Sequence, residues 1–138
     1  MADKIQLRVV TPSRMLLDEE VDEVTAPGEL GQFGVLPNHI AFLTTLVPGE
    51  LSYKRGGSRA SLAVSGGYAE VLDNRMTVLA PAAEFAEEID AARARAAKER
   101  AEKAMAGLQP EEKDWHIAQA AWRRAQARLD VAMREARR

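Results

Sequence analysis

Few side chains in this sequence could act as catalysts, and none has a partner at a suitable spacing. The chain has no cysteine, which excludes thiol nucleophiles, disulfides and thiolate zinc sites. His39 has no partner apparent nearby in the sequence, so we interpret it as a loop residue. His116, beside Trp115 near the start of the second expected helix, is interpreted as a helix-surface residue. Ser65 lacks the glycine two positions earlier that a nucleophile elbow requires. We therefore predict no metal site and no catalytic function.

Motifs for binding polyanions are also missing. Gly28, Gly31 and Gly34 are three apart, unlike a dinucleotide fingerprint, and no Gly-Lys-Ser/Thr follows them. The last segment is rich in arginine, but the whole chain carries a net charge of −2 and has no zinc module or interleaved aromatic residues. We predict no nucleic-acid partner, and the basic segment is more typical of a solvated or protein-docking helix face.

One set of charges stands at helical spacing. Asp90 and Arg93 are three residues apart, and Arg100 follows two turns later. Asp90 and Arg93 can form a first-turn ion pair, which stabilises a helix by about 0.2–0.5 kcal/mol. Alternatively, Asp90 can accept hydrogen bonds from a ligand while the arginines face phosphates. Spacing alone favours the ordinary ion pair, because two charges at helical spacing are common on solvated helices.

The composition changes near residues 82–88, which indicates two structural parts. Eight of nine glycines and five of six prolines lie at or before Pro81, whereas residues 82–138 contain 18 alanines. The first part has short runs of branched and alternating residues between turn signals, which is typical of an all-β sandwich or barrel. Asp73 and Asn74 suit a hairpin turn, because both tolerate left-handed backbone. The expected strands are Lys4–Thr11, Val21–Ala26, Phe42–Leu46, Leu51–Lys54, Ser61–Val64, Tyr68–Leu72 and Met76–Ala80.

The second part has the period of two helices. Apolar residues recur at spacings of three and four, and alanine predominates among them. Gly107 can supply a left-handed cap and Pro110 can open the next helix, which predicts an antiparallel hairpin. Because a buried methyl group removes little area from water, we expect this hairpin to be weakly docked and able to detach while helical. The two stripes are Ala94, Ala97, Ala101, Met105 and Leu108, then Ala118, Trp122, Ala125, Leu129, Ala132 and Ala136.

Charge and hydropathy indicate which kinds of partner surface the chain can contact. Residues 1–83 carry 7 basic and 10 acidic side chains (−3), and residues 84–138 carry 12 and 11 (+1). Residues 113–138 carry 7 and 3 (+4), which favours an acidic partner surface for the final helix. No apolar run approaches the roughly 18–20 residues of a membrane span, and no signal peptide is recognisable. We expect contact with a membrane only through partners.

Two segments carry a specific resemblance to a known family. They are Thr25–His39, with Leu43–Leu46 and Pro48-Gly49 following it, and Ser65–Ala80. In order and spacing they resemble the signature of the epsilon subunit of F-type (rotary) ATP synthases, and the similarity extends from Lys4 to Arg138. It implies an α+β fold, with a β-sandwich of about ten strands followed by a two-helix hairpin. We place the two domains at 1–84 and 85–138.

The resemblance implies a non-catalytic rotor subunit that couples proton-driven rotation to ATP synthesis. The sandwich would contact the gamma subunit and the c-ring loops, and a mobile hairpin would reach the catalytic alpha/beta hexamer and inhibit ATP hydrolysis. The complex would lie at the cytoplasmic face of a bacterial inner membrane. Gln32 stands where some relatives carry glutamate. The residues implied in gamma or c-ring contact are Glu29, Gln32, Phe33, Pro37, Asn38 and His39.

The segment Ile89–Ala94 matches the I/L-D-x-x-R-A motif, which resembles the ATP-binding site of some bacterial members. The resemblance implies no required cofactor, but ATP as a candidate regulatory ligand. Ile117 stands where an ATP-binding relative has arginine, which would weaken phosphate binding. The residues implied in ATP binding are Glu84, Ile89, Asp90, Arg93, Ala94, Arg100, Arg124 and Arg128.

Two other functions fit parts of the sequence. One is a free-standing ATP-sensing regulatory protein whose hairpin closes over nucleotide. The other is a β-sandwich hydrolase, which would need a nucleophile and base that the sequence does not reveal. Co-purification with a gamma subunit and a catalytic hexamer distinguishes a rotor subunit from both.

Overall fold

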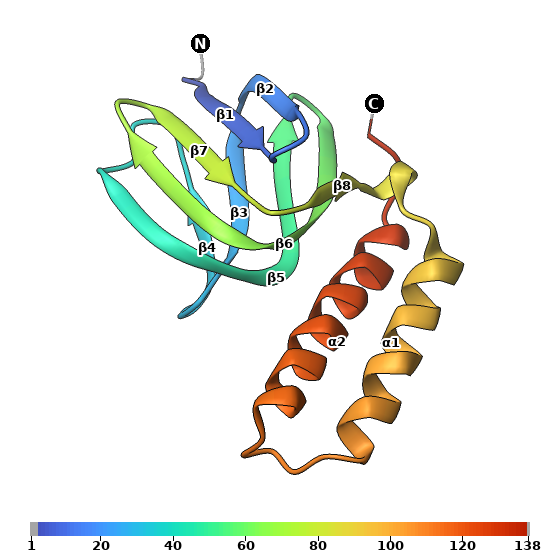
Figure 1. Cartoon of the computed structure of the whole chain (residues 1–138). Helices are drawn as coiled ribbons and strands as arrows, with labels where there is room; N and C mark the ends of the chain where they lie inside the picture. Colours follow the sequence, from blue (N-terminus) through green and yellow to red (C-terminus); the bar gives the residue numbers. More distant parts are fainter. Residues whose placement is uncertain (1–2, 138) are drawn as a thin grey trace.

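The computed structural model describes residues 3–137, which form a β domain followed by two helices (Figure 1). A single 3-10 turn, η1 (Ala86–Glu88), joins the two parts. The strands are β1 (Ile5–Val10), β2 (Met15–Val21), β3 (Glu23–Gly28), β4 (Gly31–Val35), β5 (Phe42–Arg55), β6 (Ser58–Leu72), β7 (Arg75–Leu79) and β8 (Ala83–Phe85).

The strands belong to one hydrogen-bonded sheet that curls around a common core. Its order is β2-β1-β7-β6-β5-β3-β4, with β8 added beside β6. Among the strand pairs within residues 3–137, only β1–β7 is parallel. The first half of β6 pairs with β8 and the second half with β7, so this long strand has a different neighbour along each half. The expected fold class is confirmed, with eight described strands against about ten expected.

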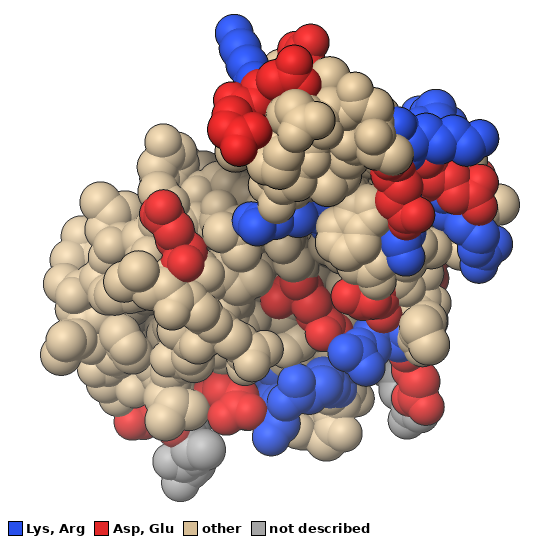
Figure 2. Space-filling view, turned by 90° about the horizontal axis from the view of Figure 1, so that it is seen from below, with Lys and Arg blue, Asp and Glu red and all other residues tan. Residues whose placement is uncertain are grey.

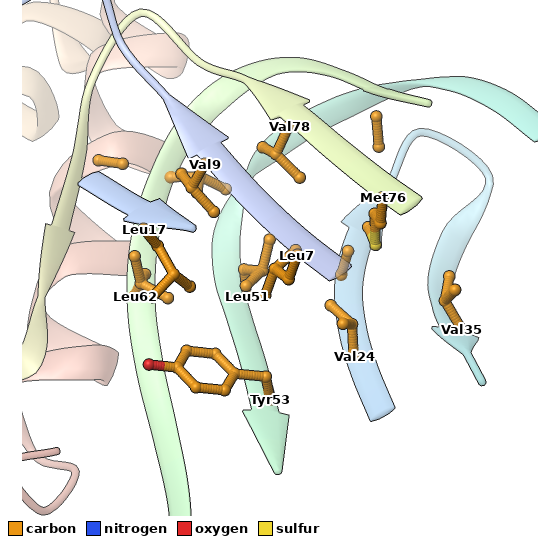
Figure 3. Packing of buried hydrophobic residues seen from close by; sticks show 14 of the residues in the cluster. Leu7, Val9, Leu17, Val24, Val35, Leu51, Tyr53, Leu62, Met76 and Val78 are labelled. Atoms are coloured by element: carbon orange, nitrogen blue, oxygen red, sulfur yellow. The ribbon is translucent and has the colours of Figure 1, made fainter. Parts of the chain in front are cut away.

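The sheet encloses an apolar core because its strands alternate. In β1, Ile5, Leu7 and Val9 point inward and are fully buried, while the residues between them are partly exposed. Figure 3 shows their partners from the other strands, including Leu51, Leu62 and Met76, packed against them. The inward side chains of the strands thus form one continuous apolar core.

Comparison with the expected strands shows where local patterns were sufficient. Asp73 and Asn74 form the β6–β7 turn with φ of 50° and 58°, which confirms the predicted left-handed turn. The runs predicted separately within 42–55 and 58–72 are continuous strands, since the intervening Pro48 and Gly66 are accommodated in an unbroken β5–β6 register. Three strands were not predicted: β2, β4 and β8.

Helix α1 spans Ala91–Ala106 and α2 spans Lys113–Ala132. The expected left-handed cap at Gly107 is wrong, because this residue has φ −91° and the last turn of α1 closes with i→i+3 bonds instead. The expected start of α2 at Pro110 is also wrong. Glu112 N donates to Gln109 O at 3.0 Å, so Pro110 occupies a turn that precedes the helix.

The hairpin lies against the sandwich through α2, with α1 on its outer side (Figure 1). Ala118 and Ala125 of α2 are buried, as the stripes predicted. A second buried side of α2, Ala127 and Val131, was not predicted; Val131 packs with Ala63 of β6 and Ala86 of η1. Among residues 3–137, no helix combines the length and apolar character needed to cross a membrane.

Candidate functional site

A hollow of about 420 Å³ lies where β8, the middle of β6 and both helices meet. We call it the hairpin hollow. Its alanines leave room because a methyl group fills little of the space between the helices and the sheet. The lining residues are Ser65, Ala82, Glu84, Arg93, Ala97, Ala121, Arg124, Ala125 and Arg128.

Three arginines and one glutamate provide the charge of the hairpin hollow. Arg128 Nε donates to Glu84 Oε1 at 2.7 Å, which joins α2 to β8. Arg93 on α1 and Arg124 on α2 are exposed at its opening. The formal charge of these four side chains is +2, an arrangement that favours an anion with several oxygen atoms. Figure 2 shows basic and acidic side chains gathered around the crevice between hairpin and sandwich.

The edge of the hollow nearest the sheet is fixed by backbone contacts. Ser65 N donates to Ala82 O at 3.0 Å, and Ala82 N donates to Ser65 Oγ at 2.9 Å. These paired bonds hold the segment before β8, and thereby Glu84, in place. Ser65 lies inside β6 and has this structural role.

The structure brings together four of the eight residues implied in ATP binding: Glu84, Arg93, Arg124 and Arg128. Asp90 instead caps α1, where its Oδ1 accepts from Arg93 N at 3.0 Å. No ion pair between the Asp90 and Arg93 side chains is present in the described part of the chain, so the cap replaces the expected first-turn pair.

The other three implied residues do not line the hollow. Ile89 packs against the small apolar cluster of Ala63, Ala86 and Val131. Ala94 is fully buried. Arg100 lies on an exposed position of α1, two turns beyond Arg93. Ala121, Ser65 and Ala82 were missed by sequence reasoning, because their part in the hollow depends on how α2 docks on the sheet.

The residues implied in gamma or c-ring contact lie along β4 and its two flanking loops. Glu29 is in the β3–β4 turn, where its carboxylate accepts from Thr45 Oγ1 and its N–H donates to Thr45 O at 3.1 Å. The turn is tight: a Cβ on Gly28 would lie 2.8 Å from Gly31 O. Gln32 is exposed on β4 and Pro37 is partly buried after it.

The loop after β4 is fixed at its base. Asn38 has φ 65°, and its N–H donates to Asn74 Oδ1 at 2.8 Å. His39 Nδ1 contacts Ile40 O at 2.8 Å, which agrees with a structural loop histidine. Phe42 stacks edge-on with both Phe33 and His39, at ring-centroid distances of 5.4 and 5.9 Å. Glu29 and His39 therefore lie at opposite ends of β4 and form no single cluster.

Large apolar side chains stand exposed around these loops, and sequence reasoning missed them. Leu30, at the β3–β4 turn, is fully exposed. The other exposed apolar side chains in and beside the loop after β4 are Leu36, Ile40, Phe42 and Leu43.

A separate hollow of about 490 Å³ is almost entirely apolar. It is lined by Val10, Pro12, Tyr68, Leu79 and neighbouring residues.

The fold and these surfaces define a class of protein: a rigid β-sandwich with exposed contact surfaces and a docked helical hairpin. Residues 4–86 match the family described as ATP synthase, Delta/Epsilon chain, beta-sandwich domain, and residues 87–133 match the long alpha-helix domain of the same chain. The chain therefore belongs to the delta/epsilon family of ATP synthase subunits. The predicted resemblance and the predicted non-catalytic role as a subunit are confirmed.

Full-length relatives and solved structures agree with this membership. The chain is 52% identical over 137 residues to an ATP synthase epsilon chain of Geobacter metallireducens, covering 99% of both. It is 54% identical over 132 residues to that of Syntrophobacter fumaroxidans, covering 96% of this chain and 98% of the relative. A chain in the Euglena gracilis mitochondrial ATP synthase, a structure of OSCP, F1 and c-ring, matches with TM-score 0.80 at 27% identity, covering 95% and 82%. The Tetrahymena thermophila central stalk/c-ring structure, at TM-score 0.63 and 16% identity, shares the fold.

Proposed function

We propose that this chain is the epsilon subunit of a bacterial F-type ATP synthase, turning with the central stalk. In this proposal the sandwich contacts the gamma subunit and the c-ring loops. The complex lies at the cytoplasmic face of the inner membrane, which the chain reaches only through its partners. The bacterial relatives and the central-stalk and c-ring assemblies of the structural matches support this placement.

The exposed apolar side chains of the sandwich support a partner at its loops. Leu30, Ile40 and Leu43 are exposed by 100%, 79% and 69%, which leaves large apolar areas in water unless another protein covers them. The hydrogen bonds of Glu29 and Asn38 fix the β3–β4 turn, which carries Leu30, and the loop after β4, which carries Ile40. A fixed loop transmits torque better than a mobile one, because little motion is lost in the loop itself.

The observation that carries the regulatory role is the small apolar contact between hairpin and sandwich. That contact is the cluster of Ala63, Ala86 and Val131 with Ile89 at its edge, whereas the sandwich core contains 21 buried residues. The hairpin can therefore detach while the sandwich stays folded. We propose that the detached hairpin reaches the alpha/beta hexamer and inhibits ATP hydrolysis.

Removing residues 87–138 from the subunit in the reconstituted complex tests this role. We expect the rate of ATP hydrolysis to rise, because the inhibitory element is gone. The matched control is the complex with the full-length chain, and recovery of the shortened chain with gamma shows that it is assembled. An unchanged rate in an assembled complex would contradict the inhibitory role.

We further propose ATP as a regulatory ligand of the hairpin hollow. Its volume of about 420 Å³ lies in the range of small-molecule sites, and Arg93, Arg124 and Arg128 face it from two helices. Because one face of the hollow is sheet and two are helix, a bound nucleotide would hold the hairpin docked. Calorimetric titration of the isolated chain with ATP tests this, and no heat at millimolar ATP would reject it.

A further inference from the structure

The chain that follows α2 returns to the sandwich and makes two arginine contacts there. Arg134 donates to Glu50 of β5 through both Nε and Nη2, at 2.9 and 3.0 Å. This two-bond geometry is the strongest form of an arginine–carboxylate pair. It joins residues 84 positions apart in the sequence, so it exists only while the hairpin is docked.

Arg137 makes the second contact, at η1. Its Nε lies 2.7 Å from Glu87 Oε1, and its guanidinium lies 3.6 Å from the centre of the Phe85 ring. Phe85 is fully buried, and the guanidinium of Arg137 is one of the groups that cover its ring. The guanidinium of Arg137 is attracted both to the face of the Phe85 ring and to the carboxylate of Glu87.

The joint between hairpin and sandwich combines these charged contacts with a small apolar one. Apart from Val131 and Ile89, the apolar cluster between hairpin and sandwich offers only the methyl groups of Ala63 and Ala86. Arg128 adds its pair with Glu84. The side chains of Arg134 and Arg137 are 55% and 43% exposed, so dissolved salt reaches and screens both contacts.

We propose that Arg134 and Arg137, with Glu50, Glu87 and Phe85, form a latch that keeps the hairpin docked and that ionic screening releases. This proposal rests on the proposed function in one respect, since a latch regulates the subunit only if the hairpin moves. The latch proposal adds that charged contacts just after the end of α2 determine whether the hairpin is docked. The two helices remain helical when it opens, because their contact with each other is separate.

The test uses fluorescence energy transfer in the isolated full-length chain. The natural sequence has no cysteine, so Leu30→Cys and Gln109→Cys give two labelling sites, in the β3–β4 turn and the α1–α2 turn. Both positions are exposed. Transfer between the dyes reports whether the hairpin lies against the sandwich. Salt is varied from about 20 mM to about 1 M, which shortens the Debye length from roughly 20 Å to roughly 3 Å.

The latch variant is Arg134→Gln with Arg137→Gln, and the matched control is Arg95→Gln with Arg123→Gln. Both variants lose two positive charges, and the control positions are exposed on α1 and α2. At low salt we expect the ratio of released to docked hairpin to rise about tenfold in the latch variant and to stay near the wild-type value in the control. Wild type and control should reach the released fraction of the latch variant only at high salt.

Exchanging the charges gives a second variant. Arg134→Glu combined with Glu50→Arg restores the pair in reverse, so it should dock better than Arg134→Glu alone. Equal transfer in the latch variant and the control at every salt concentration would overturn the latch. That outcome leaves the hydrolysis experiment on the complex unaffected, so a failed latch and a failed inhibitory role are distinguishable.

Discussion

Arg128 of α2 donates to Glu84 of β8 across 2.7 Å, and this pair forms one wall of the hairpin hollow. Its members lie 44 residues apart and belong to different parts of the molecule. The pair therefore links the docking of the hairpin to the charge available for an anion. A ligand in the hollow meets Arg128 only in the docked state.

Replacing Arg128 by glutamine should weaken ATP binding to the isolated chain. The side chain would lose its charge and a charged hydrogen bond worth about 1.5–3 kcal/mol, so we expect the dissociation constant to rise at least about tenfold. Calorimetric titration measures it. Arg123→Gln is the matched control, since Arg123 lies on α2 but does not line the hollow. Equal weakening by both variants would show that only overall charge matters.

Replacing Ile117 by arginine should have the opposite effect. Ile117, Ala121, Arg124 and Arg128 follow one another at spacings of four, three and four along α2, so Ile117 extends the face that lines the hollow. Its side chain is exposed, and an arginine there has room to reach a phosphate. We expect ATP affinity to increase about threefold to tenfold, from one added charge-assisted hydrogen bond.

The control for this prediction is Ile117→Gln, which removes the apolar side chain without adding charge. Its affinity should stay near that of the wild type. If Ile117→Arg and Ile117→Gln bind ATP equally, phosphates do not approach this end of the face.

Local patterns predicted the architecture well. The loss of glycine and proline after Pro81 separated sheet from hairpin, and the stripe residues Ala94, Ala101, Ala118 and Ala125 are buried as expected. The Asp73-Asn74 turn was predictable because backbone preference is a property of the two residues themselves. The errors at Gly107 and Pro110 arose because each residue suits two local structures. Gly107 fits a left-handed cap or an i→i+3 turn, and Pro110 fits the first turn of a helix or a turn before it.

The docking of the hairpin was not predictable in the same way. Val131 and Ala127 form a second buried side of α2 that a single-stripe interpretation misses. The strand β2 was hidden because its acidic residues obscure the alternation. The contacts of Glu84 with Arg128 and of Glu50 with Arg134 join distant segments, and no local pattern identifies such pairs.

Acidification should destabilise the chain through Glu50. Burial raises the pKa of this carboxyl group, but hydrogen bonds from Arg134 and Ser61 and the charges of Arg134 and Arg59 lower it more, so the net pKa lies below the usual 4.5. A lowered pKa in the folded state means that ionised Glu50 stabilises the fold above about pH 4.5. This contribution is lost as the pH falls through the folded-state pKa.

Urea unfolding at neutral pH and again below the usual glutamate pKa measures this effect. The free energy of unfolding should fall less on acidification in Glu50→Gln than in the wild type. Glu99→Gln, on the exposed side of α1, should keep the full wild-type fall. The prediction is wrong if Glu50→Gln and Glu99→Gln lose the same free energy.

The strictest steric requirement in the sandwich is at Gly67, in the middle of β6. Gly67 has φ +110°, and a Cβ placed there would lie 2.0 Å from Leu79 O of β7. Gly67→Ala should therefore force β6 and β7 apart and destabilise the fold by about 3 kcal/mol or more, the upper range for one strained residue. Gly57, in the β5–β6 turn, has open space around it and no such φ, so Gly57→Ala should stay close to the wild type. Urea unfolding of both variants compares them directly. Equal stability of the two variants would mean that β7 moves away from residue 67 at little cost in free energy. The core beneath Leu79 would then be less rigid than the burial of that core indicates.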